Sequence, residues 1–116
     1  MRDDPVQTAV ADAVLRTGVF VPITVFLETA WLLRSRYRLS RADLATALRA
    51  LLDMPDVSVE LAAGIRWAVS RAEVAGDIAD LVHLVASRNA GAFATFDGDV
   101  ATAAGDDSPV PVETLA

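Results

Sequence analysis

The sequence contains no cysteine and no lysine. Without cysteine there is no disulfide framework and no thiolate chemistry, and without lysine there is no Schiff-base chemistry and no P-loop. No apolar run approaches the roughly 20 residues that span a bilayer. The start, MRDDPVQ, lacks both the basic and the apolar segment of a signal peptide. These absences favour a cytoplasmic protein with no membrane association.

Positive charge is scarce. Ten basic residues, all arginine, stand against sixteen acidic ones, which gives a net charge of −6. This balance argues against a protein that binds nucleic acid through broad phosphate neutralisation. It does not exclude a nuclease, because bound divalent cations would reverse the sign locally. With 116 residues, 53% of them hydrophobic, the chain is expected to form one globular domain over residues 1–116.

Short apolar runs alternate with helical patterns along the chain. Helices are predicted at 4–18, 24–37, 40–54, 61–75 and 77–90, and strands at 19–23, 57–61, 92–96 and 110–115. Asp4 and Ser40 are placed to cap two of these helices, and Gly18, Gly76 and Gly91 to end three. The alternation predicts an α/β fold with a parallel sheet, in which ligands bind at the carboxyl ends of the strands.

Acidic residues lie beside the segments that are expected to form the core. Glu28 stands in an apolar helix, where a buried carboxylate would need a cation or a hydrogen-bond donor; an arginine-paired structural glutamate is the alternative. Asp77 and Asp80 are three residues apart, so they share one face of a helix's first turn. Taken alone, both are more simply explained as residues that cap that helix and interact favourably with its dipole. His83 extends the same face and is more simply a helix-surface residue.

Asp97 ends a predicted strand, and Gly98 and Asp99 follow it. A turn explains this pattern, as it does for the solvated Asp106 and Asp107. Yet Glu28, Asp80 and Asp97 come from three elements that each lie near the carboxyl end of a strand. Such carboxylates would repel one another unless a divalent cation neutralised them, and hard oxygen ligands suit Mg²⁺ or Mn²⁺. We therefore favour a metal site.

The ordered segments LETAWLL, DIADLVHL and ATFDGD resemble the PIN-domain ribonucleases, in particular the VapC-type toxins of toxin–antitoxin modules. The resemblance runs from Asp3 to the end of the chain. It implies a three-layer α/β/α fold with a central parallel sheet and a metal-dependent endoribonuclease, the toxin of a type II toxin–antitoxin system. It also implies RNA as substrate, a homodimer, and a cognate antitoxin that occupies the acidic crevice.

By position in that family, Glu28, Asp80 and Asp97 correspond to the catalytic, metal-binding acids, with Asp77 and Asp99 as auxiliary metal ligands. Strand alternation puts Thr95 on the same side as Asp97, where it is expected to hydrogen-bond within the site. For RNA contact the nearest arginines follow Glu28 on its helix: Arg34 and Arg36 first, then Arg38 and Arg41. Compensation of the helix dipole is the alternative role for these arginines.

One family feature is missing from the chain. Members begin with a central strand that carries an Asp-Thr-Asn-like motif, whereas MRDDPVQ resembles the segment after it. Loss of that strand would remove a metal ligand and expose two strand edges. Either the native gene product starts upstream and is an active nuclease, which we favour, or the chain is a degenerate relative that serves only as an interaction module. In-frame translation of the DNA upstream of Met1 distinguishes the two. A receiver domain is disfavoured because it needs a lysine.

Overall fold

The structure is a computed structural model in which residues 18–115 are described. The helix predicted for residues 4–18, with its cap at Asp4, lies outside this range except for Gly18. Strands and helices alternate in the order β1 (Val19–Val21), α2 (Ile23–Ser35), α3 (Arg41–Leu52), β2 (Val57–Val59), α4 (Ala62–Val74), α5 (Ile78–Ala86), β3 (Phe93–Thr95), α6 (Gly98–Ala104) and β4 (Val112–Thr114), with a 3₁₀ turn at Gly105–Asp107. The predicted α/β class is confirmed, and each element predicted in this range is present, with strands shorter than expected.

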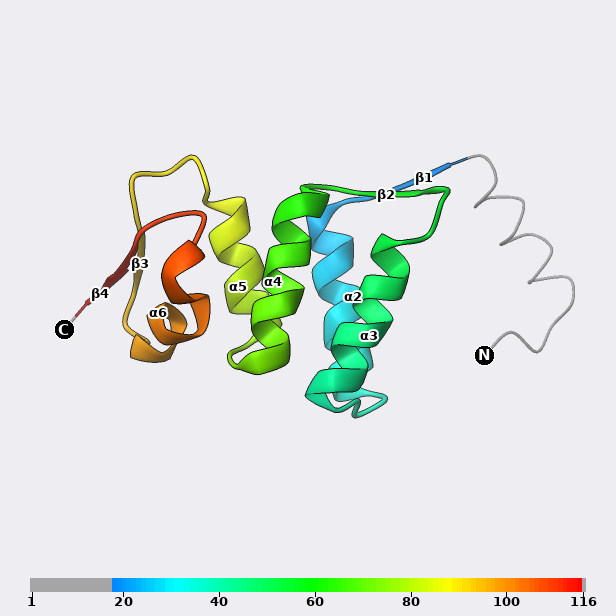
Figure 1. The fold of residues 1–116 in the computed structure, drawn as a ribbon, viewed down its shortest axis with the longest axis horizontal. Coiled ribbons are helices and arrows are strands. Elements are labelled where there is room, and N and C mark those ends of the chain that lie inside the picture. The colour runs from blue at the N-terminus through cyan, green and yellow to red at the C-terminus, as the bar shows by residue number, and fades with distance from the viewer. Residues whose placement is uncertain (1–17, 116) are drawn as a thin grey trace, which may run out of the picture.

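The strands pair in parallel, as predicted, but they do not form one central sheet. β1 pairs only with β2, with Val19 opposite Val57, and β3 pairs only with β4, with Phe93 opposite Val112. Figure 1 shows the two pairs at opposite ends of the molecule, with the helices between them. The expected single central sheet is therefore not formed within residues 18–115 and stays a prediction. The physical reason is that no further strand in this range pairs with β1 or β3 and joins the two halves.

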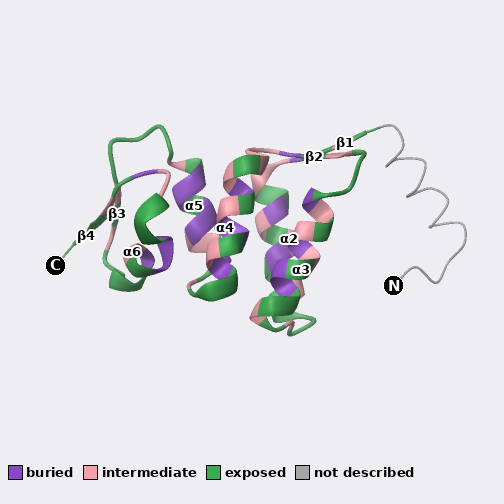
Figure 2. Ribbon diagram, in the orientation of Figure 1, coloured by how far each residue is buried: buried purple, intermediate pink, exposed green. Residues whose placement is uncertain are grey.

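Most of the core lies between the helices, and Val21 of β1 and Val59 of β2 also belong to it. Helices α2 to α5 stand side by side, and each turns its apolar stripe inward (Figure 2). The largest fully buried side chains are Phe26, Leu48, Ile65, Leu81, Leu84, Val69, Val82, Val85 and Val110. The radius of gyration is 15.7 Å, whereas a compact domain of about 100 residues has about 13 Å. The described part of the chain is thus elongated.

Helix ends are fixed by specific hydrogen bonds. Ser40 accepts the N–H of Asp43 at 3.1 Å, which confirms the predicted cap of α3. Helix α2 has Pro22 at its N-cap, which offers no capping side chain, and Glu60 Oε1 at the end of β2 accepts the N–H of Ile23 at 2.8 Å instead. A residue 37 positions away therefore holds the start of the helix that carries Glu28.

The turn between α4 and α5 packs tightly on α6. Gly76 has φ +90°, and a Cβ at this position would lie 2.4 Å from the Cβ of Ala103. Arg41 donates to the carbonyl oxygens of Ala72 and Gly76 and so closes the end of α4. Arg71 Nε donates to the carbonyl oxygen of Ala103 at 2.8 Å. These contacts fix α6 against the rest of the molecule. No helix within residues 18–115 is long and apolar enough to cross a membrane.

Candidate functional site

Two helices begin at the same place with an aspartate each. Asp77 is the N-cap of α5, where its Oδ1 accepts the N–H of Ala79 at 2.7 Å. Asp97 is the N-cap of α6, where its Oδ1 accepts the N–H of Asp99 at 2.9 Å. Thr95 Oγ1, in the last residue of β3, accepts the N–H of Asp97 at 3.0 Å and so fixes the backbone that carries this carboxylate. The Oδ1 of Asp77 thus caps α5, as the simpler explanation of this residue predicts.

These two helix starts enclose an acidic pocket of about 170 Å³. Four of the five acids that the sequence singled out as metal ligands line it: Asp77, Asp80, Asp97 and Asp99. The remaining wall is formed by Gly76, Leu81, Val100 and Ala103. The pocket therefore combines carboxylates from two helices with a largely apolar floor. We refer to it below as the acidic pocket.

Asp80 is the acid whose ionisation the pocket opposes. Burial raises the pKa of Asp80, and the negative charges of Asp77 and Asp97 raise it further, while His83 acts in the opposite direction. A carboxyl that is partly removed from water beside other carboxylates is costly to ionise. A cation would relieve this repulsion, so the raised pKa of Asp80 is compatible with a positively charged ligand in the acidic pocket.

Glu28 does not join the other acids. It is exposed on α2 and does not line the acidic pocket, so the described residues do not place it in that pocket with Asp80 and Asp97. The reason is that α2 packs through one stripe only, which buries Phe26 and Ala30 and leaves Val25, Trp31 and Leu32 exposed. Its carboxylate therefore remains in water and needs no partner for stability.

The donor set of the acidic pocket fits a hydrated divalent ion. Among residues 18–115, no three acidic or histidine side chains are close enough together to hold a metal ion as they stand. Mg²⁺, however, keeps several of its waters and is usually bound through one or two carboxylates. The volume of about 170 Å³ is well above the roughly 10–15 Å³ that one water needs. Whether Glu28, Asp77, Asp80, Asp97 and Asp99 bind metal stays a prediction.

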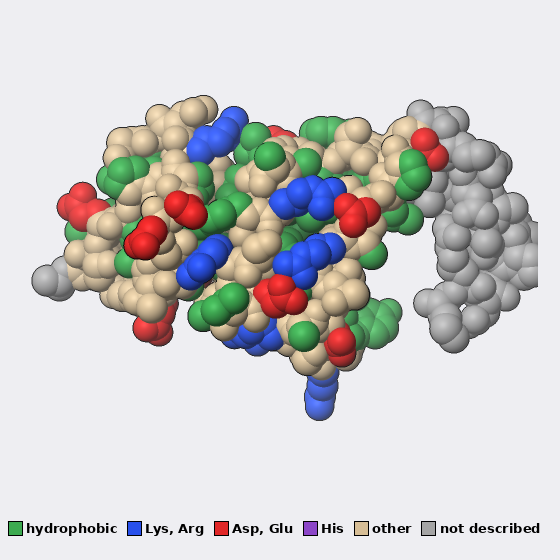
Figure 3. Space-filling view, in the orientation of Figure 1, with side chains coloured by type: hydrophobic (Ala, Val, Ile, Leu, Met, Phe, Trp, Pro, Cys, Tyr) green, Lys and Arg blue, Asp and Glu red, His purple; other side chains and the backbone are tan. Residues whose placement is uncertain are grey.

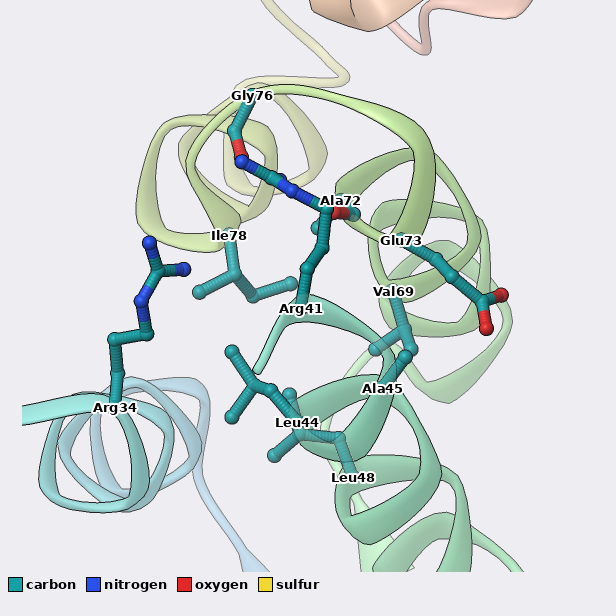
Figure 4. Close-up of a pocket in the computed structure, with 10 residues that line it drawn as sticks. All are labelled: Arg34, Arg41, Leu44, Ala45, Leu48, Val69, Ala72, Glu73, Gly76 and Ile78. Carbon is teal, nitrogen blue, oxygen red and sulfur yellow. The ribbon is translucent and has the colours of Figure 1, made fainter. Parts of the chain in front are cut away.

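The arginines predicted to contact RNA occupy different surroundings. Arg34, in the last turn of α2, lines a pocket between α2 and the start of α5 that also includes Asp77. Figure 4 shows its guanidinium extended toward Ile78, whereas Arg41 points to the carbonyls of Ala72 and Gly76. Arg36 is exposed at the C-cap of α2. On the face in Figure 3, arginine side chains are gathered over the central helices.

Sequence reasoning had assigned no site role to Glu60, Gly76 and Trp31, and of these three Gly76 lines the acidic pocket. Glu60 supports α2 through a hydrogen bond to Ile23 that no local pattern reveals. Gly76 lines the acidic pocket and allows α6 to approach; its position before an N-cap aspartate was a usable signal. Trp31 is 63% exposed. Its spacing, three residues after Glu28 and three before Arg34, places these residues on one helix face.

Comparison with known proteins gives one match. A family model described as PIN domain matches residues 1–106, which is most of the chain. No curated protein and no solved structure is significantly similar to it.

Proposed function

Since the chain belongs to the PIN domain family, we propose that it is a divalent-metal-dependent endoribonuclease. PIN domains are in general nucleases, and they typically use divalent metal ions. The proposal for this chain is supported above all by the acidic pocket, in which Asp80 has a raised pKa because of burial and the charges of Asp77 and Asp97. Such a perturbed acid beside like charges is a mark of a functional site.

The residues of the acidic pocket divide the work. Asp80 and Asp97 would hold the ion directly, because both line the pocket and the charge of Asp97 acts on the carboxyl of Asp80. Asp77 and Asp99 would orient its waters, and Thr95 would keep Asp97 in place through its hydrogen bond. A bound divalent ion supplies a hydroxide nucleophile and stabilises the charge on the phosphodiester.

The proposed role of Glu28 depends on how the two strand pairs are joined. We propose that β1–β2 and β3–β4 are two halves of one three-layer α/β/α sheet, and that a central strand outside residues 18–115 joins their free edges. The support is that all pairing is parallel and that β1 and β3 each have an unpaired edge among the described residues. Closure of the sheet would bring α2, and Glu28 with it, closer to the acidic pocket.

The biological role that fits this activity is the toxin of a type II toxin–antitoxin system. We propose RNA as the substrate, a homodimer as the assembly and an antitoxin that places a basic side chain in the acidic pocket. Charge supports the last point, because four aspartates line that pocket. The compartment proposed for this role is the cytoplasm.

The experiment combines metal binding with RNA cleavage. Calorimetry with Mn²⁺ compares the unaltered chain with Asp80→Asn and Asp97→Asn, and with Asp107→Asn, an exposed acid outside the acidic pocket, as the matched control. Loss of a metal's second-shell partner already costs about 10–100-fold, so each site variant should weaken binding at least about tenfold. Cleavage of labelled single-stranded RNA should require Mg²⁺ or Mn²⁺ and disappear in the same two variants. Unchanged Mn²⁺ affinity in both would refute the proposal.

A non-catalytic interaction module is the second candidate. It is favoured by Glu28, which lies outside the acidic pocket, and by the capping bonds that already engage Asp77 and Asp97. In that case the acids serve only to start helices, and the exposed Val25, Trp31 and Leu32 on α2 form a contact surface. The two functions are told apart by the titration above, because an interaction module binds no Mn²⁺ at the acidic pocket and cleaves no RNA.

A further inference from the structure

A second pocket adjoins the acidic one. It has a volume of about 120 Å³ and lies between α2 and the start of α5, lined by Leu27, Ala30, Trp31, Arg34, Asp77, Ile78 and Ala79. Asp77 lines both pockets. Anything bound in this α2–α5 groove would therefore lie directly beside the acidic pocket.

Trp31 is the largest apolar side chain that lines the groove. Its side chain is 63% exposed, although the preceding residue, Ala30, is only 1% exposed. A tryptophan offers a large rigid ring, and in a soluble domain an exposed one often marks a binding surface. The ring is therefore available to a ligand at the edge of the groove.

Arg34 follows Trp31 by three residues and lies on the same face of α2. With the described residues it forms no ion pair and no side-chain hydrogen bond, in contrast to Arg49, which pairs with Glu73 at 2.7 Å. Figure 4 shows the Arg34 guanidinium directed toward the start of α5 and away from the carboxylate of Glu73. The groove thus carries two charged residues, Arg34 and Asp77, and Arg34 makes no ion pair with either Asp77 or any other described residue.

We propose that the α2–α5 groove binds one nucleotide of single-stranded RNA next to the cleaved phosphodiester. The base stacks on Trp31 and the phosphate on its far side contacts Arg34. This inference rests on the ribonuclease function proposed above. Aromatic stacking combined with an arginine is how proteins bind single strands without reading their sequence.

Charge distribution supports RNA as the occupant. The chain carries a net charge of −6, and the acidic pocket alone would repel a phosphodiester. Arg34 supplies a positive charge in the groove that shares Asp77 with the acidic pocket, and we assign the next phosphate of the same strand to it. A nucleic acid alternates phosphates and bases. A cation in the acidic pocket would suit its phosphate, and the aromatic and basic groove beside it would suit the next base and phosphate.

The test uses a variant in which Trp31 is the only tryptophan. The chain has two, and Trp67 Nε1 is buried without a hydrogen-bond partner in the described residues, so Trp67→Phe removes an unpaired N–H and should be tolerated. In this background a 2′-O-methyl uridine octamer, which resists cleavage, is titrated once in EDTA and once in Ca²⁺. Emission of Trp31 reports stacking, and anisotropy of a label on the octamer reports binding.

The octamer is expected to quench Trp31. Trp31→Ala should weaken binding about tenfold and Trp31→Phe by less than about threefold, since phenylalanine still stacks. Arg34→Ala should reduce the slope of log K against log salt by about one, with partial rescue by Arg34→Lys. Tyr37→Ala and Arg88→Ala, which change exposed residues outside both pockets, are the matched controls and should leave affinity unchanged.

Several results would overturn the proposal that the groove binds RNA. If Trp31 in the free protein is shielded from quenching by acrylamide, its ring is not available for a base. The occupant of the groove is then a partner protein or a second copy of the chain. If the octamer does not bind, or if Trp31→Ala leaves its affinity unchanged, the groove is not an RNA site. If RNA is cleaved normally in Trp31→Ala, the ribonuclease stands and the groove fails. If the octamer quenches Trp31 but no RNA is cleaved with metal, the nuclease fails and the groove stands.

Discussion

Asp77 and Asp97 begin two different helices and line the same pocket. Each accepts the backbone N–H two residues further on through its Oδ1. The second carboxylate oxygen of each aspartate takes no part in these capping hydrogen bonds. Capping and metal binding, which compete as explanations of the sequence, are thus compatible in the folded chain, and different substitutions separate them.

Asp77→Asn should keep the cap and lose the charge. Asparagine caps helices as well as aspartate does, so the free energy of unfolding should change by less than about 0.5 kcal/mol, whereas Asp77→Ala should cost about 1 kcal/mol. Both variants should bind Mn²⁺ more weakly. Urea unfolding in EDTA and calorimetry measure the two effects; equal Mn²⁺ affinity in Asp77→Asn and the unaltered chain would limit Asp77 to its capping role.

Asp80→Asn should stabilise the protein at neutral pH in the absence of metal. The fold raises the pKa of Asp80 through burial and the charges of Asp77 and Asp97. A raised pKa means that Asp80 favours folding fully below its unfolded pKa, about 3.9, and that this contribution is lost as pH rises through the folded pKa. Asparagine stays neutral throughout.

The pH dependence of this difference can be measured by thermal unfolding of both proteins in EDTA. The advantage of Asp80→Asn should be largest near pH 7 and shrink as the pH falls toward the unfolded pKa. Asp107→Asn, in an exposed turn, should show no such trend. An advantage that grows with acidity would contradict the raised pKa, and added Mn²⁺ should reverse the order at neutral pH.

Gly76→Ala should destabilise the fold by about 2–3 kcal/mol. Its φ of +90° is strained for any residue with a Cβ, and that Cβ would lie 2.4 Å from the Cβ of Ala103. Gly91→Ala is the matched control, since an added Cβ there has no atom within 4 Å and no positive φ. Urea unfolding should leave Gly91→Ala unchanged or slightly more stable. Equal effects at the two positions would show that α6 does not pack closely on the turn.

Glu60→Ala should loosen the start of α2. Removal of the carboxylate that accepts the N–H of Ile23 at 2.8 Å should cost about 0.5–2 kcal/mol, as loss of other N-caps does. Glu113→Ala, an exposed glutamate on β4, should have little effect. Amide exchange at Ile23 should quicken only in Glu60→Ala, and an unchanged rate would mean that Pro22 alone sets the helix start.

Local patterns in the sequence predicted most of the elements but not their assembly. The cap at Ser40 and the helix that starts after Asp77 follow from neighbouring residues, which is why both are confirmed. Helix α6 was missed because it is only seven residues long and begins with Gly98, so Asp97 looked like a turn. The cap from Glu60 was missed because it joins residues 37 positions apart.

The site was predicted in part for the same reason. Alternation of strands and helices predicted that Asp80 and Asp97 would meet, and both line the acidic pocket. Glu28 was placed with them on the assumption of a continuous sheet, and α2 instead turns Glu28 to solvent on the face opposite Phe26. Which face of an apolar helix is buried depends on its neighbours in space, and sequence periodicity does not supply those for α2.

The separation of the strands into two pairs has a consequence for motion. β3, β4 and α6 form a short segment whose ladder is three residues long and whose contacts with the helical core include those of Gly76 and Arg71 with Ala103. Such a segment opens more readily than the helices beside it and exchanges its amide hydrogens faster. We therefore expect the α6 wall of the acidic pocket to open more readily than the α5 wall, although its contacts with Gly76 and Arg71 hold it in the folded structure. A ligand that binds both Asp80 and Asp97 would hold the two walls of the acidic pocket together.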